Sequence, residues 1–174
     1  MKDKILNLNG MVVNSNTHFL IIEDEKDISD SILEILDLIG FNGPIYQAFN
    51  IKMAKEYLQE NKVEYILSDW NLPDGKGISL LKAIRSTKKY ECLPFLMITA
   101  NNDVDSMIIS SKIGVSEYLV KPFTVNEFQS KLVEGWKYHL VKNEDFILTL
   151  KNKILELEQK IIYLEKENNK LKNN

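Results

Sequence analysis

The stretch HFLIIEDE, residues 18–25, decides the fold of this chain. Its apolar residues are consecutive rather than alternating, which indicates a strand buried on both faces, as in a parallel sheet that is covered by helices. The run ends at Glu23 and Asp24. Apolar residues then recur three and four positions apart as far as Gly40, which predicts an amphipathic helix that ends at this glycine.

The same unit, a short apolar run and then an amphipathic stretch, recurs along the chain to about residue 140. The further runs are residues 45–48, 63–67, 95–98 and 118–120. Asn50 and Thr124 are expected to cap helices, and another capped helix is expected to begin at Asp103 or Asp105. Strict alternation predicts the α/β class, with one five-stranded parallel sheet between two layers of helices.

The composition bounds the classes of function. Of 174 residues, 44% are hydrophobic and 27% are charged, and the net charge is -3. This balance excludes disorder of the whole chain and argues against broad capture of nucleic acid. The chain has one cysteine, no apolar stretch near the ~20 residues of a spanning helix, and no secretory signal at its start. We therefore expect a cytoplasmic protein without membrane or direct nucleic-acid binding, whose residues 1–16 are a loosely held lead-in.

Chemically active side chains stand where the predicted strands end. They are Glu23, Asp24, Asp69, Thr99 and Lys121. In a parallel sheet these ends meet at one edge, which is where the sites of such folds lie. Two carboxylates about 4 Å apart repel by about 4 kcal/mol at an effective dielectric near 20, so a divalent cation is expected between them. An all-oxygen set of ligands favours Mg²⁺.

A magnesium ion beside an amine and a hydroxyl is suited to receive a phosphoryl group. The cation and the amine neutralise the transferring oxygens, and the hydroxyl donates a hydrogen bond to one of them. One carboxylate can then be the nucleophile and form an acyl phosphate. Asp69 is the best candidate because it is central and a loop, residues 71–77, follows it. Glu23 and Asp24 are then metal ligands.

Four motifs stand in order along the chain: Glu23-Asp24, SDWNLPDG at 68–75, TA at 99–100 and KPF at 121–123. With these motifs, residues 17–137 resemble the receiver domain of two-component response regulators. The resemblance implies a flavodoxin-like sheet with strand order 2-1-3-4-5 and a signal receiver rather than an enzyme, acting only on its own aspartyl phosphate. It implies that Asp69 accepts a phosphoryl group from a sensor histidine kinase or phosphotransfer protein. It also implies that Mg²⁺ is bound by Glu23, Asp24, Asp69 and the backbone carbonyl of Asn71. Thr99 and Lys121 would contact the phosphoryl oxygens. Tyr118 would be the switch aromatic, whose movement is coupled to Thr99.

From Ile147 onward the apolar residues follow an unbroken heptad. The predicted seam is Ile147, Leu150, Ile154, Leu157, Ile161, Leu164, Asn168 and Leu171. β-Branched residues at a and leucine at d favour a parallel two-stranded coil, and a buried asparagine fixes its register. The g and e positions would pair Lys153–Glu158, Lys160–Glu165 and Glu167–Lys172, all opposite in sign. We therefore expect a receiver at residues 17–140 and a homodimerising coiled-coil helix at residues 141–174.

Four alternatives stay open at this point. Apolar residues at b positions, Leu148, Leu155 and Ile162, would also suit a tail helix packed back on its own receiver. Receiver and coil could be the regulatory front of a larger regulator, such as a diguanylate cyclase. A magnesium-dependent phosphatase of the haloacid dehalogenase type also uses an aspartate nucleophile, but expects Asp-x-Asp-x-Thr after its first strand. A dimeric scaffold that is not phosphorylated would not need the acid, threonine and lysine set.

Overall fold

The computed structural model describes residues 5–100 and 113–139, together with residues 154, 155, 157, 158, 160, 161 and 164. The chain divides into two compact units at residues 139 and 140. The expected helix from Asp103 or Asp105 lies outside the described residues. Within the described part, no helix is long and apolar enough to cross a membrane.

The first unit is built on a five-stranded parallel sheet. Its strands are β3 (Phe19–Ile22), β4 (Ile45–Ala48), β5 (Tyr65–Asp69), β8 (Phe95–Thr99) and β9 (Glu117–Val120). They lie in the order β4-β3-β5-β8-β9, which confirms the order 2-1-3-4-5. The strands end nearly level, because Asp69 pairs with Ile98 and Thr99 pairs with Val120. The residues at their carboxyl ends therefore emerge along one edge of the sheet.

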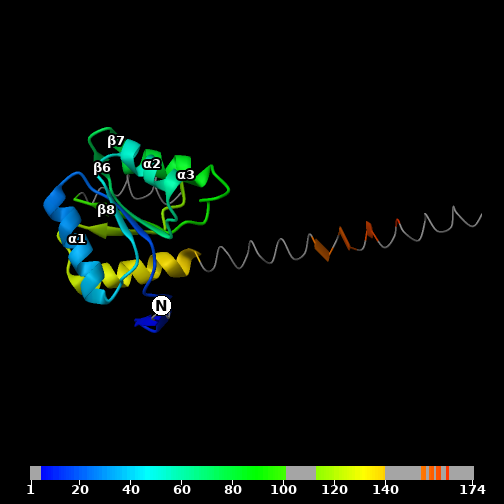
Figure 1. Ribbon diagram of the computed structural model, residues 1–174, viewed down its shortest axis with the longest axis horizontal. Coiled ribbons are helices and arrows are strands. Elements are labelled where there is room, and N and C mark those ends of the chain that lie inside the picture. The colour runs from blue at the N-terminus through cyan, green and yellow to red at the C-terminus, as the bar shows by residue number, and fades with distance from the viewer. Residues whose placement is uncertain are drawn as a thin grey trace, which may run out of the picture. The chain divides into compact units, whose positions relative to one another are not determined.

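Both faces of the sheet are buried, as the consecutive apolar runs predicted. Leu20 and Ile22 belong to one core cluster, and Phe19 and Ile21 belong to the other. Helices α2 (Ile51–Glu60) and α3 (Gly77–Arg85) contribute to the first cluster. Helix α1 (Lys26–Ile39) and the helix at residues 125–139 contribute to the second, on the opposite side of the sheet (Figure 1).

The predicted helix ends are confirmed in the described residues. Gly40 follows α1 with a φ of 107°, which favours glycine because it lacks a Cβ atom. The side chain of Asn50 accepts a hydrogen bond from the Met53 N–H at the start of α2. Thr124 and Glu127 form a reciprocal capping box before the last helix of the unit: the Glu127 N–H donates to Thr124 Oγ1, and the Thr124 N–H donates to Glu127 Oε2.

Residues 5–14 differ from the loosely held lead-in that we expected for residues 1–16. They form an antiparallel hairpin of β1 (Ile5–Leu8) and β2 (Met11–Asn14). Asn9 and Gly10 both have positive φ, 49° and 82°, as the tight turn of such a hairpin requires. Leu8 and Val13 are buried in the same cluster as α1. The hairpin is thus part of the receiver core, because its inner face is apolar and covers the α1 side.

The tail residues that the structure describes are helical and exposed. Among the predicted seam positions, these are Ile154, Leu157, Ile161 and Leu164. The other four seam positions, Ile147, Leu150, Asn168 and Leu171, lie outside the described residues. The coiled coil therefore stays a prediction.

Candidate functional site

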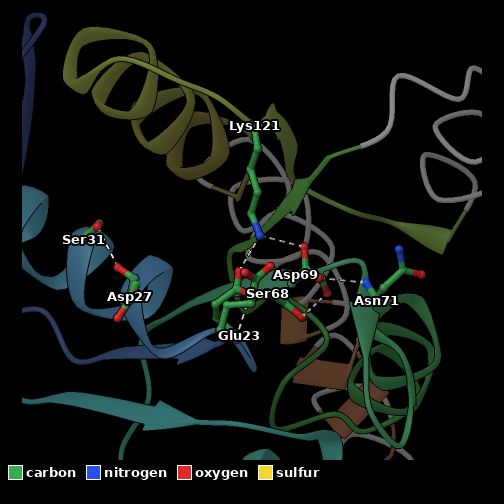
Figure 2. Close-up of polar contacts among 8 residues, drawn as sticks. Glu23, Asp27, Ser31, Ser68, Asp69, Asn71 and Lys121 are labelled. Atoms are coloured by element: carbon green, nitrogen blue, oxygen red, sulfur yellow. Dashed lines mark hydrogen bonds and ion pairs between the residues drawn. The ribbon is translucent and has the colours of Figure 1, made fainter.

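The candidate site lies at the carboxyl edge of the sheet, where side chains from three strands meet (Figure 2). Glu23 directly follows β3, Asp69 ends β5, and Lys121 directly follows β9. The Lys121 Nζ atom lies 2.6 Å from Glu23 Oε2 and 3.2 Å from Asp69 Oδ1. Lys121 is 98 positions from Glu23 and 52 positions from Asp69 along the chain, yet the three side chains share one polar cluster.

Three carboxylates form the acidic part of this cluster. Glu23, Asp24 and Asp69 each offer an oxygen, and the three oxygens lie within 4.8 Å of one another. Unit charges at that separation repel by about 3.5 kcal/mol per pair at an effective dielectric of about 20. A single ammonium group compensates only part of three negative charges. The all-oxygen set therefore fits a hard divalent cation such as Mg²⁺.

Burial and the neighbouring charges set the protonation equilibria of the cluster. Burial raises the pKa of Glu23, which is 1% exposed; the charge of Asp69 raises this pKa further, and Lys121 opposes the rise. Burial by itself would lower the pKa of Lys121. The hydrogen bond to Glu23 and the charges of Asp69 and Glu23 outweigh this effect and raise the pKa of Lys121. Lys121 therefore stays an ammonium at neutral pH.

A small hairpin begins two residues after Asp69, where the sequence predicted a loop. Its strands are β6 (Asn71–Leu72) and β7 (Gly75–Lys76). The Asn71 N–H donates to Asp69 Oδ2 at 3.1 Å, so the first residue of the hairpin lies against the carboxylate (Figure 2). Asn71 is thus next to the acidic cluster, and the implied role of its backbone carbonyl as a metal ligand stays a prediction.

Thr99 and Tyr118 lie on the neighbouring strands. Thr99 is buried at the end of β8, and the Lys121 N–H donates to the Thr99 carbonyl at 2.8 Å. Tyr118 is half-buried on β9 and is opposite Met97 of β8. The backbone therefore places Thr99 and Lys121 on adjacent chain segments at the same edge of the sheet as Asp69.

Gly77 is a site residue to which we assigned no role from the sequence. A Cβ atom at this position would lie 2.3 Å from the Asp69 carbonyl oxygen and 2.8 Å from Ser68 Oγ. The Gly77 N–H also donates to the Trp70 carbonyl, which closes the hairpin onto the strand. The chain after the hairpin can approach Asp69 this closely only without a side chain. The glycine was visible in the sequence, but the partner that it approaches was not.

The chain matches known proteins over the same region. The sequence profile of the response regulator receiver domain matches residues 19–133. Chemotaxis protein CheY-3 of Vibrio cholerae is 34% identical over 121 residues, covering 70% of this chain and 92% of that protein. The receiver domain of the Francisella response regulator 1452 has a TM-score of 0.61 at 30% identity, covering 70% of this chain and 98% of that one. The Mn²⁺-bound form of response regulator Rcp1 has a TM-score of 0.59 at 23% identity, covering 67% and 88%. This chain therefore belongs to the family of response regulator receiver domains, the signalling domains of two-component systems.

Proposed function

We propose that Asp69 accepts a phosphoryl group from a sensor histidine kinase or a phosphotransfer protein. The observation that carries the proposal is the Lys121 ammonium between Glu23 and Asp69, beside a third acid, Asp24, at the carboxyl edge of the sheet. One Asp69 oxygen attacks phosphorus, and the bond between phosphorus and the donor's imidazole nitrogen breaks. The nitrogen keeps that electron pair, and the product is an aspartyl phosphate.

The other residues of the cluster orient and neutralise the transferred group. Mg²⁺ bound by Glu23, Asp24, Asp69 and the Asn71 carbonyl would offset the charge of the phosphoryl oxygens. Lys121 already donates a hydrogen bond to Asp69, and it would donate to an oxygen of the phosphoryl group on that side chain. Thr99 would donate its hydroxyl to another of these oxygens, and Tyr118 would follow Thr99 inward. Phosphorylation then shifts the population of two arrangements of this face.

Phosphorylation can be tested with a small phosphodonor and intact-mass spectrometry. The wild-type chain incubated with acetyl phosphate and Mg²⁺ should gain one phosphoryl group, and the adduct should be absent when Mg²⁺ is chelated. Asp69→Asn keeps the size of the side chain but removes the nucleophile, so it should gain none. An adduct of equal yield on Asp69→Asn, or no adduct on the wild type, would refute the assignment.

We also propose that the tail joins two copies of the chain in a parallel coiled coil, which would couple the two receivers. Support comes from the a and d positions Ile154, Leu157, Ile161 and Leu164, which are between 49% and 56% exposed in a single copy. Exposed apolar residues that repeat at a and d positions are the seam that the partner helix covers in a coiled coil. A cytoplasmic location remains a prediction as well.

Two neighbouring leucines give a matched test of the seam. Leu157 is at a d position and Leu155 is at a b position, and they are 49% and 54% exposed. Sedimentation equilibrium should show that Leu157→Asp dissociates the dimer, whereas Leu155→Asp leaves it intact. Dissociation by Leu155→Asp alone, or a monomeric wild type, would contradict the proposed seam.

A further inference from the structure

The turn of the small hairpin after Asp69 is bound to the start of a helix on another part of the chain. Asp74 is in the two-residue turn between β6 and β7. Its Oδ1 atom accepts a hydrogen bond from the Ile51 N–H at 2.8 Å, and its Oδ2 atom accepts one from the Lys52 N–H at 2.9 Å. These are the first two N–H groups of α2, which have no partner within the helix.

Helix α2 does not need Asp74 for an ordinary cap. Asn50, the residue before the helix, already accepts a hydrogen bond from the Met53 N–H at 2.8 Å. A capping residue normally satisfies one N–H group in the first turn. The carboxylate of Asp74 adds two further bonds from a segment 22 and 23 residues away. This arrangement therefore fastens the hairpin to the helix, in addition to stabilising the helix.

Apolar contacts support the same attachment. Leu72 and Ile51 are both buried members of the core cluster on the α2 side. A Cβ atom on Gly75 would lie 3.1 Å from Ile51 Cδ1, so the hairpin approaches the first residue of α2 closely. Each hairpin strand has only two residues, so the ladder itself offers few backbone bonds to define its position. The two bonds to Asp74 therefore add to the few backbone bonds that define the position of its turn.

The charge of Asp74 suits its place at a helix N-terminus. Burial would raise the pKa of Asp74, but the amides of Ile51 and Lys52 outweigh this effect and lower the pKa below its ordinary value. Asp74 is therefore ionised at neutral pH and accepts both bonds. The opposite end of the same short hairpin is Asn71, whose N–H donates to Asp69 Oδ2.

We propose that Asp74 is a positioning residue for the metal site: by binding the N-terminus of α2, it holds the hairpin so that the Asn71 backbone lies against Asp69. The inference rests on the proposed function, because it takes Mg²⁺ as the ion that the acids and the Asn71 carbonyl bind. Asp74 acts through the hairpin and touches neither the acids nor the phosphoryl group.

The test is a Mg²⁺ titration of the full-length chain, followed by tryptophan fluorescence. Trp70 directly follows Asp69 in the chain and is buried in the core cluster on the α2 side. Trp136 instead packs with Phe19 and Phe41 in the core cluster on the α1 side. Asp74→Ala should raise the Mg²⁺ concentration for half-saturation about tenfold, the lower end of the effect of losing an outer support of a metal ligand. At saturating Mg²⁺ the maximal rate of phosphorylation by acetyl phosphate should return to within about twofold of the wild type, because the ligands and nucleophile are intact.

Two matched variants separate positioning from helix stability and from charge. Asn50→Ala removes a cap of α2 but keeps the bonds to Asp74. Glu56→Gln removes an exposed negative charge from the same helix. Both should leave the Mg²⁺ half-saturation within about 1.5-fold of the wild type, although Asn50→Ala should lower the melting temperature. An equal loss of Mg²⁺ affinity in Asn50→Ala, or no loss in Asp74→Ala, would overturn the proposal.

Hydrogen exchange provides a second measurement that needs no substitution. Coupling between two sites is reciprocal. Saturating Mg²⁺ should therefore slow hydrogen exchange of the Ile51 and Lys52 amides in the wild type. The factor should equal the factor by which Asp74→Ala weakens the affinity for Mg²⁺. The Met53 amide, which Asn50 caps, should change less. Unchanged exchange at Ile51 and Lys52 would refute the coupling. A wild type that does not bind Mg²⁺ at all would instead refute the proposed function.

Discussion

Substituting methionine for Lys121 would remove the ammonium group that lies between Glu23 and Asp69 but keep a side chain of similar length. The Lys121, Glu23 and Asp69 side chains are 15%, 1% and 12% exposed, so water can replace little of the lost attraction. Breaking a buried ion pair by removing one partner costs about 3 to 5 kcal/mol. We expect about 3 kcal/mol here, at the lower end of that range, because Lys121 and Asp69 retain some contact with water.

The assay is urea denaturation without Mg²⁺ and at saturating Mg²⁺. In Lys121→Met the three carboxylates repel without compensation, so Mg²⁺ should bind the folded variant more tightly than the wild type and raise its free energy of unfolding by a larger increment. The phosphorylation rate should nevertheless fall, because the amine that neutralises the phosphoryl oxygens is gone.

Lys131 is the matched control, because it also lies between two acids. Its Nζ atom is 2.8 Å from Glu134 Oε2 and 3.4 Å from Glu117 Oε1, but these side chains are 27% to 46% exposed. Lys131→Met should therefore cost less than about 1 kcal/mol at any Mg²⁺ concentration. Equal costs for the two substitutions, or equal Mg²⁺ increments for Lys121→Met and the wild type, would refute the account of the acidic cluster.

Three further predictions concern the core and the loops. Gly135→Ala would place a Cβ atom 2.1 Å from the Tyr65 hydroxyl, so it should lower the free energy of unfolding by about 2 kcal/mol, and Tyr65→Phe in the same chain should restore part of that loss. Leu8→Ala should cost about 2 to 3 kcal/mol and Ile5→Ala less than about 0.5 kcal/mol in urea denaturation, because only Leu8 is buried; equal small costs would exclude the hairpin from the core. The carboxylate of Asp74 has a pKa below its ordinary 3.8, so the stability that it contributes is present above pH 3.8 and is lost as the pH falls through the lowered pKa. The difference in melting temperature between the wild type and Asp74→Asn should therefore close over that pH range. A difference that widens in acid would contradict the bonds from α2 to Asp74.

The parallel sheet was predictable because its evidence is local. Consecutive apolar residues at 19–22 and 65–67 indicate strands buried on both faces, and alternation with amphipathic stretches leaves few topologies. The place of Glu23, Asp69, Thr99 and Lys121 then follows from one geometric rule, that parallel strands end at the same edge. The family resemblance supplied their strand order and their expected roles.

The N-terminal hairpin was missed although its signal was present. Asn9-Gly10 is the dipeptide that the tightest hairpin turns prefer, and Leu8 and Val13 stand at inward positions on either side of it. The abundance of asparagine suggested a solvated segment instead. Composition was a weaker guide here than the spacing of a few apolar residues around one turn.

Local patterns in the amino-acid sequence were enough to define the five strands of the parallel sheet, the described helix ends and the set of residues at the edge of that sheet. They could not show that Asp74 binds the amides of Ile51 and Lys52, or that Gly135 is small because the Tyr65 hydroxyl lies against it. Periodicity and turn chemistry act between near neighbours, whereas these contacts join segments that meet only after the sheet and its helices have packed. Their partners become known from three-dimensional distances, which no spacing along the chain contains.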